Sequence, residues 1–216
     1  MPAPSRAQSH VRFPLTNVLG SAGNVRVLRT LVADPSPQSA PQLAHLAGLS
    51  PQGARLVLDT LAVQQLVKVH GTGRVQLYAL DASHPFADAL VVLFQAEQQR
   101  WEHLLTAIRE VLDRRGTSVR AAWLYGSVAR GEDTPHSDLD IALLVSSQNA
   151  ADQAREDLQP LEDEQQVRIS LTALTPEEFA ALPDDDPWWC DVVRDARVLK
   201  GSAPAQAKRQ MVKAAT

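Results

Sequence analysis

Two short polar motifs constrain this fold more than any other feature. One stands at the end of an apolar run and the other at the start of the next. Gly126-Ser127 follows the first run, and after a spacer of ten residues Asp138-Leu139-Asp140 opens the second. Both runs predict β-strands, expected over Ser118–Tyr125 and Leu139–Ser146. The two aspartates stand at positions i and i+2 of a strand, so both carboxylates leave the same face, roughly 7 Å apart along the chain.

These residue types suit a metal ion and a polyphosphate. Two rigid carboxylates, Asp138 and Asp140, are hard oxygen ligands of the kind that Mg²⁺ or Mn²⁺ prefers. Gly126 has no Cβ, so a phosphate can approach its backbone, and Ser127 adds a hydroxyl and an N–H group. Further phosphate contacts are expected from Arg130 and Ser137. The pattern therefore predicts catalytic and metal-binding aspartates beside a nucleoside triphosphate.

The first 80 residues differ in charge from the rest. They hold seven basic and two acidic residues, a net charge of +5, whereas the remainder carries −9. Three helices are expected over Asn24–Ala33, over Ala40–Ala47 and from Ser50 to about Gln65, and a β-hairpin over Val67–His70 and Arg74–Tyr78. A basic part joined to an acidic part predicts two domains with different partners.

Three short helices followed by a hairpin resemble a winged helix-turn-helix. The resemblance implies that the third helix enters the major groove of double-stranded DNA and that the hairpin lies along its backbone. The implied DNA contacts are Gln52, Arg55 and Thr60 on the helix and Lys68 and Arg74 at the hairpin. The alternative is that these side chains are ordinary solvated surface.

A long helix is expected over Pro85–Arg115, where an apolar stripe runs without interruption. It can join the domains and pair with its copy in a homodimer, or simply pack on the second domain. The expected organisation is α+β: a winged helix-turn-helix at 1–80, the connecting helix at 81–118, a second domain with a small mixed sheet at 119–200, and a flexible tail at 201–216.

Gly-Ser, ten residues and Asp-x-Asp within a strand resemble the nucleotidyltransferase superfamily that includes DNA polymerase beta, and more closely its minimal nucleotidyltransferases. With the winged helix and the long helix, the resemblance covers about residues 20–201. It implies Mg²⁺-dependent transfer of a nucleoside monophosphate from an NTP to a hydroxyl of protein, RNA or a small molecule. Some members are antitoxins that adenylylate a toxin, so the resemblance also implies a toxin-like partner.

Active members of that superfamily use a third acid from the next strand, expected here over Gln166–Leu174. Alternation places Arg168, Ser170 and Thr172 on the face of the aspartates, with Ser170 in the position of the third acid. Five acids outside the strand could substitute only if their loops bend inward: Glu132, Asp133, Glu162, Asp163 and Glu164. Two hypotheses stay open: an active transferase, or a degenerate domain that senses a nucleotide or mediates dimerisation in a transcriptional regulator.

Other features exclude several classes of protein. No apolar run is long enough to span a membrane, and MPAPSRAQSH lacks the apolar core of a secretory signal. Cys190 is the only cysteine, so an internal disulfide is excluded and a reducing cytoplasm is expected. The six histidines, His136 among them, lack metal-ligand spacing. Trp188 and Trp189 are expected on a helix, one in the core and the other at the domain edge.

Overall fold

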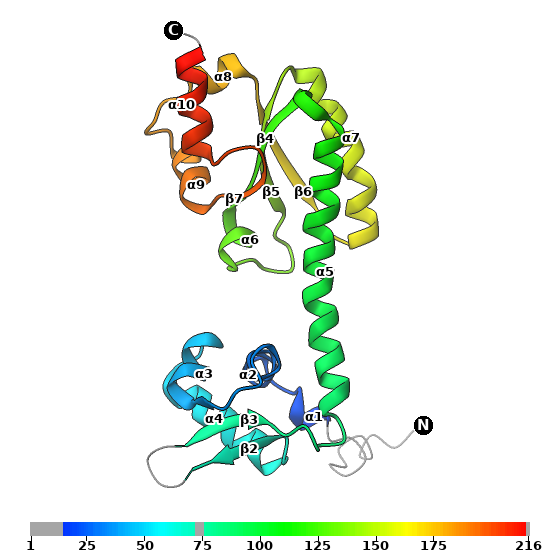
Figure 1. Cartoon of the computed structure of the whole chain (residues 1–216), viewed down its shortest axis with the longest axis vertical. Helices are drawn as coiled ribbons and strands as arrows, with labels where there is room; N and C mark the ends of the chain where they lie inside the picture. Colours follow the sequence, from blue (N-terminus) through cyan, green and yellow to red (C-terminus); the bar gives the residue numbers. More distant parts are fainter. Residues whose placement is uncertain (1–14, 72–75, 215–216) are drawn as a thin grey trace, which may run out of the picture. The chain divides into compact units, whose positions relative to one another are not determined.

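The structure is a computed structural model that describes residues 15–71 and 76–214. It is an α+β protein, as the sequence predicted, and it divides into two compact units, Met1–Gln98 and Gln99–Thr216. The division falls inside one helix, α5 (Ala87–Arg114), whereas the sequence placed boundaries near 80 and 118. Figure 1 shows α5 as one uninterrupted helix. No helix in the described ranges has the length and apolar character needed to cross a membrane.

The first unit is a winged helix-turn-helix. Its elements are α1 (Leu15–Val18), α2 (Ala22–Ala33), β1 (Gln38–Ser39), α3 (Ala40–Leu46), α4 (Pro51–Val63), β2 (Val67–His70) and β3 (Leu77–Leu80). The strands form an antiparallel sheet in the order β1-β3-β2, and β2 and β3 make the expected hairpin. The predicted position Arg74 lies in 72–75, outside the described residues.

Local sequence signals explain where these helices begin. The hydroxyl of Ser50 accepts a hydrogen bond from the backbone N–H of Gly53, and Pro51 occupies the first turn of α4. Ser39 and Gln42 form a capping box at the start of α3. A hydroxyl at the N-cap satisfies a backbone donor that has no partner inside the helix, so each serine fixes a helix start.

The second unit is built on a four-stranded sheet in the order β6-β5-β4-β7. After α5 come a short 3₁₀ turn (Gly116–Ser118), β4 (Val119–Tyr125), α6 (Gly126–Arg130), β5 (Leu139–Val145), α7 (Gln148–Gln165), β6 (Ile169–Leu174), α8 (Pro176–Ala181), α9 (Pro187–Asp195), β7 (Arg197–Lys200) and α10 (Pro204–Ala214). β5 and β6 run parallel, whereas β4 is antiparallel to β5 and to β7.

Alternation along the central strands divides the sheet into two buried faces. One face carries Leu124 and Ile141 and packs against α5 and α7. The other carries Trp123 and packs against an aromatic cluster that includes Phe179 and Trp189. In Figure 1, α5 and α7 lie on one side of the sheet and α8, α9 and α10 on the other. The expected separation of the two neighbouring tryptophans is confirmed, since Trp189 is buried and Trp188 lies at the edge.

The segment after Gly201 differs from its prediction as a flexible tail. Its residues form α10, with Ala207 buried against the aromatic cluster. The Lys208 ammonium donates hydrogen bonds to the carbonyl of Leu182 and to the carboxylate of Asp184, 2.7 and 2.6 Å away. Alanine, lysine and glutamine favour helix, and the helix gains stability because it has a partner surface.

Candidate functional site

The candidate site lies where β4 ends and β5 begins. Tyr125 of β4 is the register partner of Asp140, and Asp140 is the register partner of Ser170 in β6. Because partners in adjacent strands point to the same face, the side chains of all these residues share one face of the sheet. The predicted position of Ser170, on the strand next to the aspartates, agrees with this register.

Gly126 brings the backbone directly against the carboxylate of Asp140. Its φ is +78°, and a Cβ built on it would lie 2.6 Å from Asp140 Oδ2. Any larger residue would therefore clash with the carboxylate as well as adopt an unfavourable backbone conformation. The sharp turn from β4 into α6 depends on glycine at this position.

Asp140 is a half-buried carboxylate with a perturbed pKa. Burial raises its pKa above the ordinary value, and the nearby charge of Asp138 raises it further. The hydroxyl of Ser170 opposes this, since its hydrogen bond to the carboxylate lowers the pKa. Desolvation disfavours the charged form, and a donated hydrogen bond favours it. Ser170 is the register partner of Asp140, and its hydroxyl favours the charged form of that carboxylate.

Asp138 faces a guanidinium. Arg168 Nε lies 3.1 Å from Asp138 Oδ1, close enough for an ion pair although this oxygen accepts no hydrogen bond from the described residues. Arg168 Nη2 also donates a hydrogen bond to the carbonyl of His136 at 3.0 Å. The side chains of Arg168 and Asp138 are 68% and 45% exposed. Arg168 therefore supplies positive charge at one of the two candidate metal ligands.

The donor set does not fit a divalent metal centre of the family's kind. Within the described residues, no group of three or more histidines, cysteines, aspartates or glutamates is placed to hold a metal ion. Two like unit charges about 4 Å apart repel by about 1 kcal/mol even in water, so Arg168 opposes a cation at Asp138. Ser170 is a neutral hydroxyl at the place where a third carboxylate would face the metal.

The acids that could have replaced the third carboxylate have other surroundings. Glu162 Oε1 accepts a hydrogen bond from the backbone N–H of Ile169 at 2.6 Å, and Glu132 is paired with Arg130 at 2.7 Å. Asp133 and Asp163 line a groove of about 640 Å³ between α5, α7 and the spacer loop. Arg168 also lines this groove, which therefore adjoins the candidate site.

Arg130, predicted to bind phosphate, is instead committed to an ion-pair network. Its Nη1 donates to the carboxylate of Asp195 in α9, and its Nε donates to Glu132. Asp195 is almost fully buried, with a side chain 2% exposed, and also accepts from Arg194. Hydrogen bonds from Arg194 and Arg130 hold the pKa of Asp195 below its ordinary value. The network ties α6 to α9.

The two predicted serines have different surroundings. Ser137 stabilises the spacer loop, because its hydroxyl accepts a hydrogen bond from the N–H of Thr134 at 2.9 Å. Ser127 is half-buried in the first turn of α6, one residue beyond Gly126, and its carbonyl accepts from the N–H of Glu132. Of the predicted phosphate contacts, Gly126 thus lies against Asp140 with Ser127 next to it in the chain, while the side chains of Arg130 and Ser137 have partners within the protein.

Trp188 contacts Tyr125 on the sheet face that carries Asp140, a contact that the sequence did not indicate. Trp188 Nε1 donates a hydrogen bond to the hydroxyl of Tyr125 at 2.9 Å, and the two rings meet edge to face. The Tyr125 hydroxyl lies 3.5 Å from the Thr172 hydroxyl. The only sequence signal for this contact was Tyr125, which directly precedes Gly126. Its partner, Trp188, is 63 residues away in the chain, so the pairing could not be predicted.

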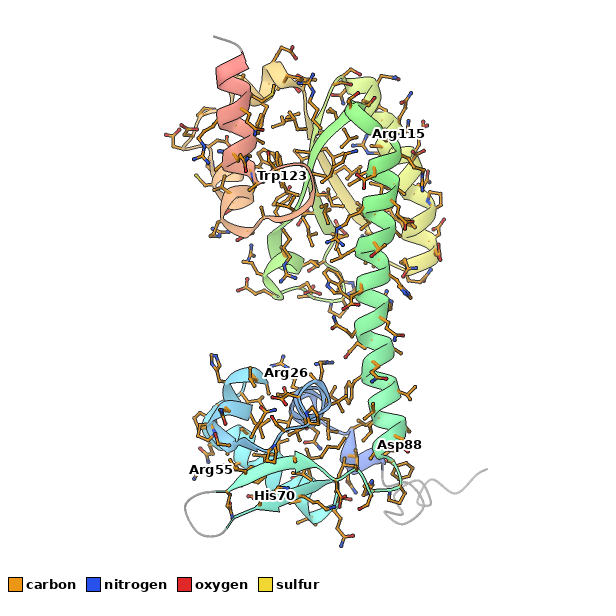
Figure 2. The ribbon with its side chains drawn as sticks, in the orientation of Figure 1. Arg26, Arg55, His70, Asp88, Arg115 and Trp123 are labelled. Carbon is orange, nitrogen blue, oxygen red and sulfur yellow. The ribbon has the colours of Figure 1, made fainter. Side chains whose placement is uncertain are left out.

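The candidate DNA-binding surface lies on α4. Gln52, Arg55 and Thr60 are all exposed, and Figure 2 shows Arg55 at the outer surface of the first unit. Leu56 lies on the same helix and is 62% exposed, a residue that the sequence analysis did not single out.

Lys68 is paired within its own unit. Its ammonium lies 2.7 Å from Asp81 Oδ1, although the lysine side chain remains 54% exposed. Hydrogen bonds from Lys68 and from Ser83 lower the pKa of Asp81 to about 2. The ion pair with Asp81 neutralises part of the charge that Lys68 would offer to a DNA phosphate, and the sequence did not indicate this pairing.

Comparisons with known proteins identify part of the chain. Residues 106–181 match the family model described as polymerase beta, nucleotidyltransferase. No curated protein matches significantly. Among solved structures, the chain resembles the AntR antimony-specific transcriptional repressor, with 19% identity, a TM-score of 0.37 and coverage of 48% of this chain and 97% of that one.

Other similar structures belong to toxin–antitoxin complexes. One, a toxin-antitoxin with AMP-PNP, shares 18% identity at a TM-score of 0.35 and covers 51% of this chain and 86% of that chain. Another is a tri-AMPylated Shewanella oneidensis HEPN toxin in complex with MNT antitoxin, at 18% identity and a TM-score of 0.33, covering 53% of this chain and 85% of that one.

Proposed function

We propose that this chain, whose residues 106–181 form a polymerase beta-type nucleotidyltransferase domain, is a DNA-binding regulator that binds a nucleoside triphosphate without transferring it. The observation that carries the proposal is the register of β5 and β6, in which Ser170 faces Asp140. The protein would sense the nucleotide in its second unit and read DNA with its first.

The loss of transfer follows from the chemistry of Ser170. A transferase must activate the attacking hydroxyl, and a general base works best when its pKa lies near the working pH. A serine hydroxyl is a far weaker base than a carboxylate near neutral pH. Here it is the register partner of Asp140, at the place where a carboxylate base would have to lie.

The retained half of the site supports nucleotide binding. Ser127 lies in the first turn of α6 directly after Gly126, and the exposed guanidinium of Arg168 offers a charged donor beside Asp138. Arginine forms paired hydrogen bonds to phosphate oxygens, which makes it a good phosphate ligand. The class of ligand that fits is a polyphosphate ester.

The first unit supports the DNA-binding half of the proposal. A winged helix-turn-helix with net positive charge and an exposed α4 presents Gln52, Arg55 and Thr60 for base and phosphate contacts. A homodimer on paired half-sites, with α5 at the interface, completes this proposal because such modules commonly read two-fold sites.

Transfer remains the second candidate function, favoured by one specific observation. Asp138 and Asp140 stand two residues apart at the start of β5, and the Asp140 carboxylate lies against Gly126 at the turn into α6. In that case the protein would move a nucleoside monophosphate to a protein or RNA hydroxyl, a toxin-like partner included, with Mg²⁺ or Mn²⁺ as cofactor.

A labelling experiment separates the two functions. Purified protein and cell extract are incubated with each NTP, labelled at the α-phosphate, in Mg²⁺ and in Mn²⁺, beside an Asp138→Ala/Asp140→Ala double variant. The proposal expects no labelled macromolecule with the wild type that is not also labelled with the double variant. It also expects an NTP to change the affinity of the wild type for genomic duplex fragments. Label that appears only with the wild type would establish the transferase instead.

A further inference from the structure

We propose that Arg168 is a built-in cation that takes the place of the family's metal at Asp138, so that the site binds a polyphosphate without a divalent ion. The inference deepens the proposed function and rests on it for the ligand class. It also makes a separate claim about metal binding that can be tested with no nucleotide present.

The position of Arg168 follows from its strand. β6 begins one residue later at Ile169, whose register partner is Leu139, so Arg168 stands beside Asp138. The backbone N–H of Leu139 donates to the carbonyl of Arg168 at 2.7 Å, which extends the strand pairing back to this residue. Arg168 and Asp138 each lie one residue before a strand, and the hydrogen bond between Leu139 and Arg168 holds these two strand starts together.

Two contacts orient the guanidinium and leave part of it available. Nε faces Asp138 at 3.1 Å, and Nη2 donates to the carbonyl of His136 at 3.0 Å. Nη1 has no hydrogen-bond partner among the residues that the structure describes, and the side chain is 68% exposed. A guanidinium held on one edge can still offer N–H groups on the other, so an incoming phosphate oxygen can bind without displacing Asp138.

The rest of the site lacks what a metal would need. Asp140 is half-buried and faces Ser170, a neutral hydroxyl, in the next strand, while Asp138 is already balanced by the positive charge of Arg168. Hard divalent cations require several oxygen ligands and usually one or two free carboxylates. Because Arg168 already neutralises one of the two carboxylates, the site has little excess negative charge to attract a metal ion.

The first test measures metal binding alone. Mn²⁺ is titrated against the full chain and followed by electron paramagnetic resonance, for the wild type and for an Arg168→Gln/Ser170→Asp double variant. The proposal expects little or no bound Mn²⁺ in the wild type and a clear bound fraction in the double variant. Equal binding by both proteins would overturn it, whatever either protein does with nucleotides.

The second test measures ATP and GTP affinity by calorimetry, in Mg²⁺ and in excess EDTA. The wild type is expected to bind equally well in both conditions, and Arg168→Gln to lose roughly ten- to a hundredfold in EDTA, the usual size for a lost hydrogen bond to a charged group. Arg155→Gln is the matched control, an exposed arginine paired with an aspartate on α7, and should bind like the wild type.

The outcomes of the two tests are distinguishable. Binding that disappears in EDTA in the wild type would overturn the role of Arg168 while leaving nucleotide sensing intact. If neither nucleotide binds in either condition, the proposed function fails, and the Mn²⁺ comparison still decides whether Arg168 excludes the metal.

Discussion

Gly126 and Asp140 lie so close that the Asp140 carboxylate fills the space that a side chain at position 126 would need. A Cβ at position 126 would lie 2.6 Å from Asp140 Oδ2, and φ there is +78°. Gly126→Ala is therefore expected to destabilise the second unit by about 2–4 kcal/mol, from overpacking and from the left-handed backbone. Urea unfolding measures the loss.

Gly131→Ala is the matched control for that change. Its φ is +73°, but nothing lies within 4 Å of the added Cβ. Only the backbone contribution remains, and the cost should be about 1 kcal/mol. Equal losses at the two positions would contradict the role given to the Asp140 carboxylate.

Arg115 fastens the end of α5 to α7. Its Nε donates to Asp157 at 2.7 Å, and its Nη1 donates to Gln153 at 2.8 Å. Arg115→Ala should lower the free energy of unfolding by about 1–3 kcal/mol because charge-assisted hydrogen bonds are lost in a partly buried position. Arg114→Ala removes an exposed neighbour and should stay within about 0.5 kcal/mol of the wild type. Chemical unfolding of both variants tests the difference.

Arg130 is expected to matter for folding and not for the ligand. Arg130→Gln leaves the buried carboxylate of Asp195 with one fewer donor, so the melting temperature should fall. Glu132→Gln removes only the exposed partner and should have a smaller effect. Calorimetric melting and ATP titration, run on both variants, check this. A wild-type melting temperature with lost ATP binding would restore Arg130 as a phosphate ligand.

Asp81 makes the stability of the first unit depend on acid. Its folded pKa of about 2 lies below the value of about 3.9 in an unfolded chain, so its stabilising effect is complete above pH 4 or so. It is lost as the pH falls toward 2, because the unfolded state then binds the proton more readily. Asp81→Asn should remove this part of the acid sensitivity, as amide signals of the hairpin followed by NMR would show.

The same substitution releases Lys68 for DNA. Asp81→Asn should raise the affinity for duplex DNA and steepen its salt dependence, because each added phosphate contact releases a counterion. Asp59→Asn changes the net charge equally on exposed α4 and frees no partner of Lys68. A gain in affinity that is no larger in Asp81→Asn than in the control would show that the ion pair does not withhold Lys68.

Arg55 offers the direct test of the α4 surface. Arg55→Ala should weaken binding to duplex DNA and reduce the slope of log K against log salt by about 1 if it contacts a phosphate. Arg155→Ala, an exposed position of the second unit, supplies the control for the change in net charge. Filter binding at several salt concentrations gives both slopes, and identical slopes would remove Arg55 from the interface.

Features with local signals were predictable from sequence. The capping box of Thr175 and Glu178 marks the start of α8, and Ser50-Pro51 marks the start of α4. Strand alternation was enough to place Ser170 on the face of the aspartates, because a period of two fixes the face of every side chain once the strand is known. Its register opposite Asp140 required coordinates.

Features that depend on distant partners were not predictable. Arg130 and Asp195 are 65 residues apart, so nothing near Arg130 in the sequence indicates that it will form an ion pair with a buried carboxylate. The helix after Gly201 has good helix formers, yet its stability depends on the aromatic cluster that receives Ala207. Arg168 was expected on the face of the aspartates, but its distance from Asp138 required coordinates.

The placement of the aromatic cluster has a spectroscopic consequence. All four tryptophans, Trp101, Trp123, Trp188 and Trp189, belong to the unit Gln99–Thr216. Tryptophan fluorescence therefore reports on that unit alone, because the winged helix-turn-helix unit contains no tryptophan. A fluorescence melt and a far-ultraviolet dichroism melt of the same sample will disagree whenever the two units lose their structure at different temperatures.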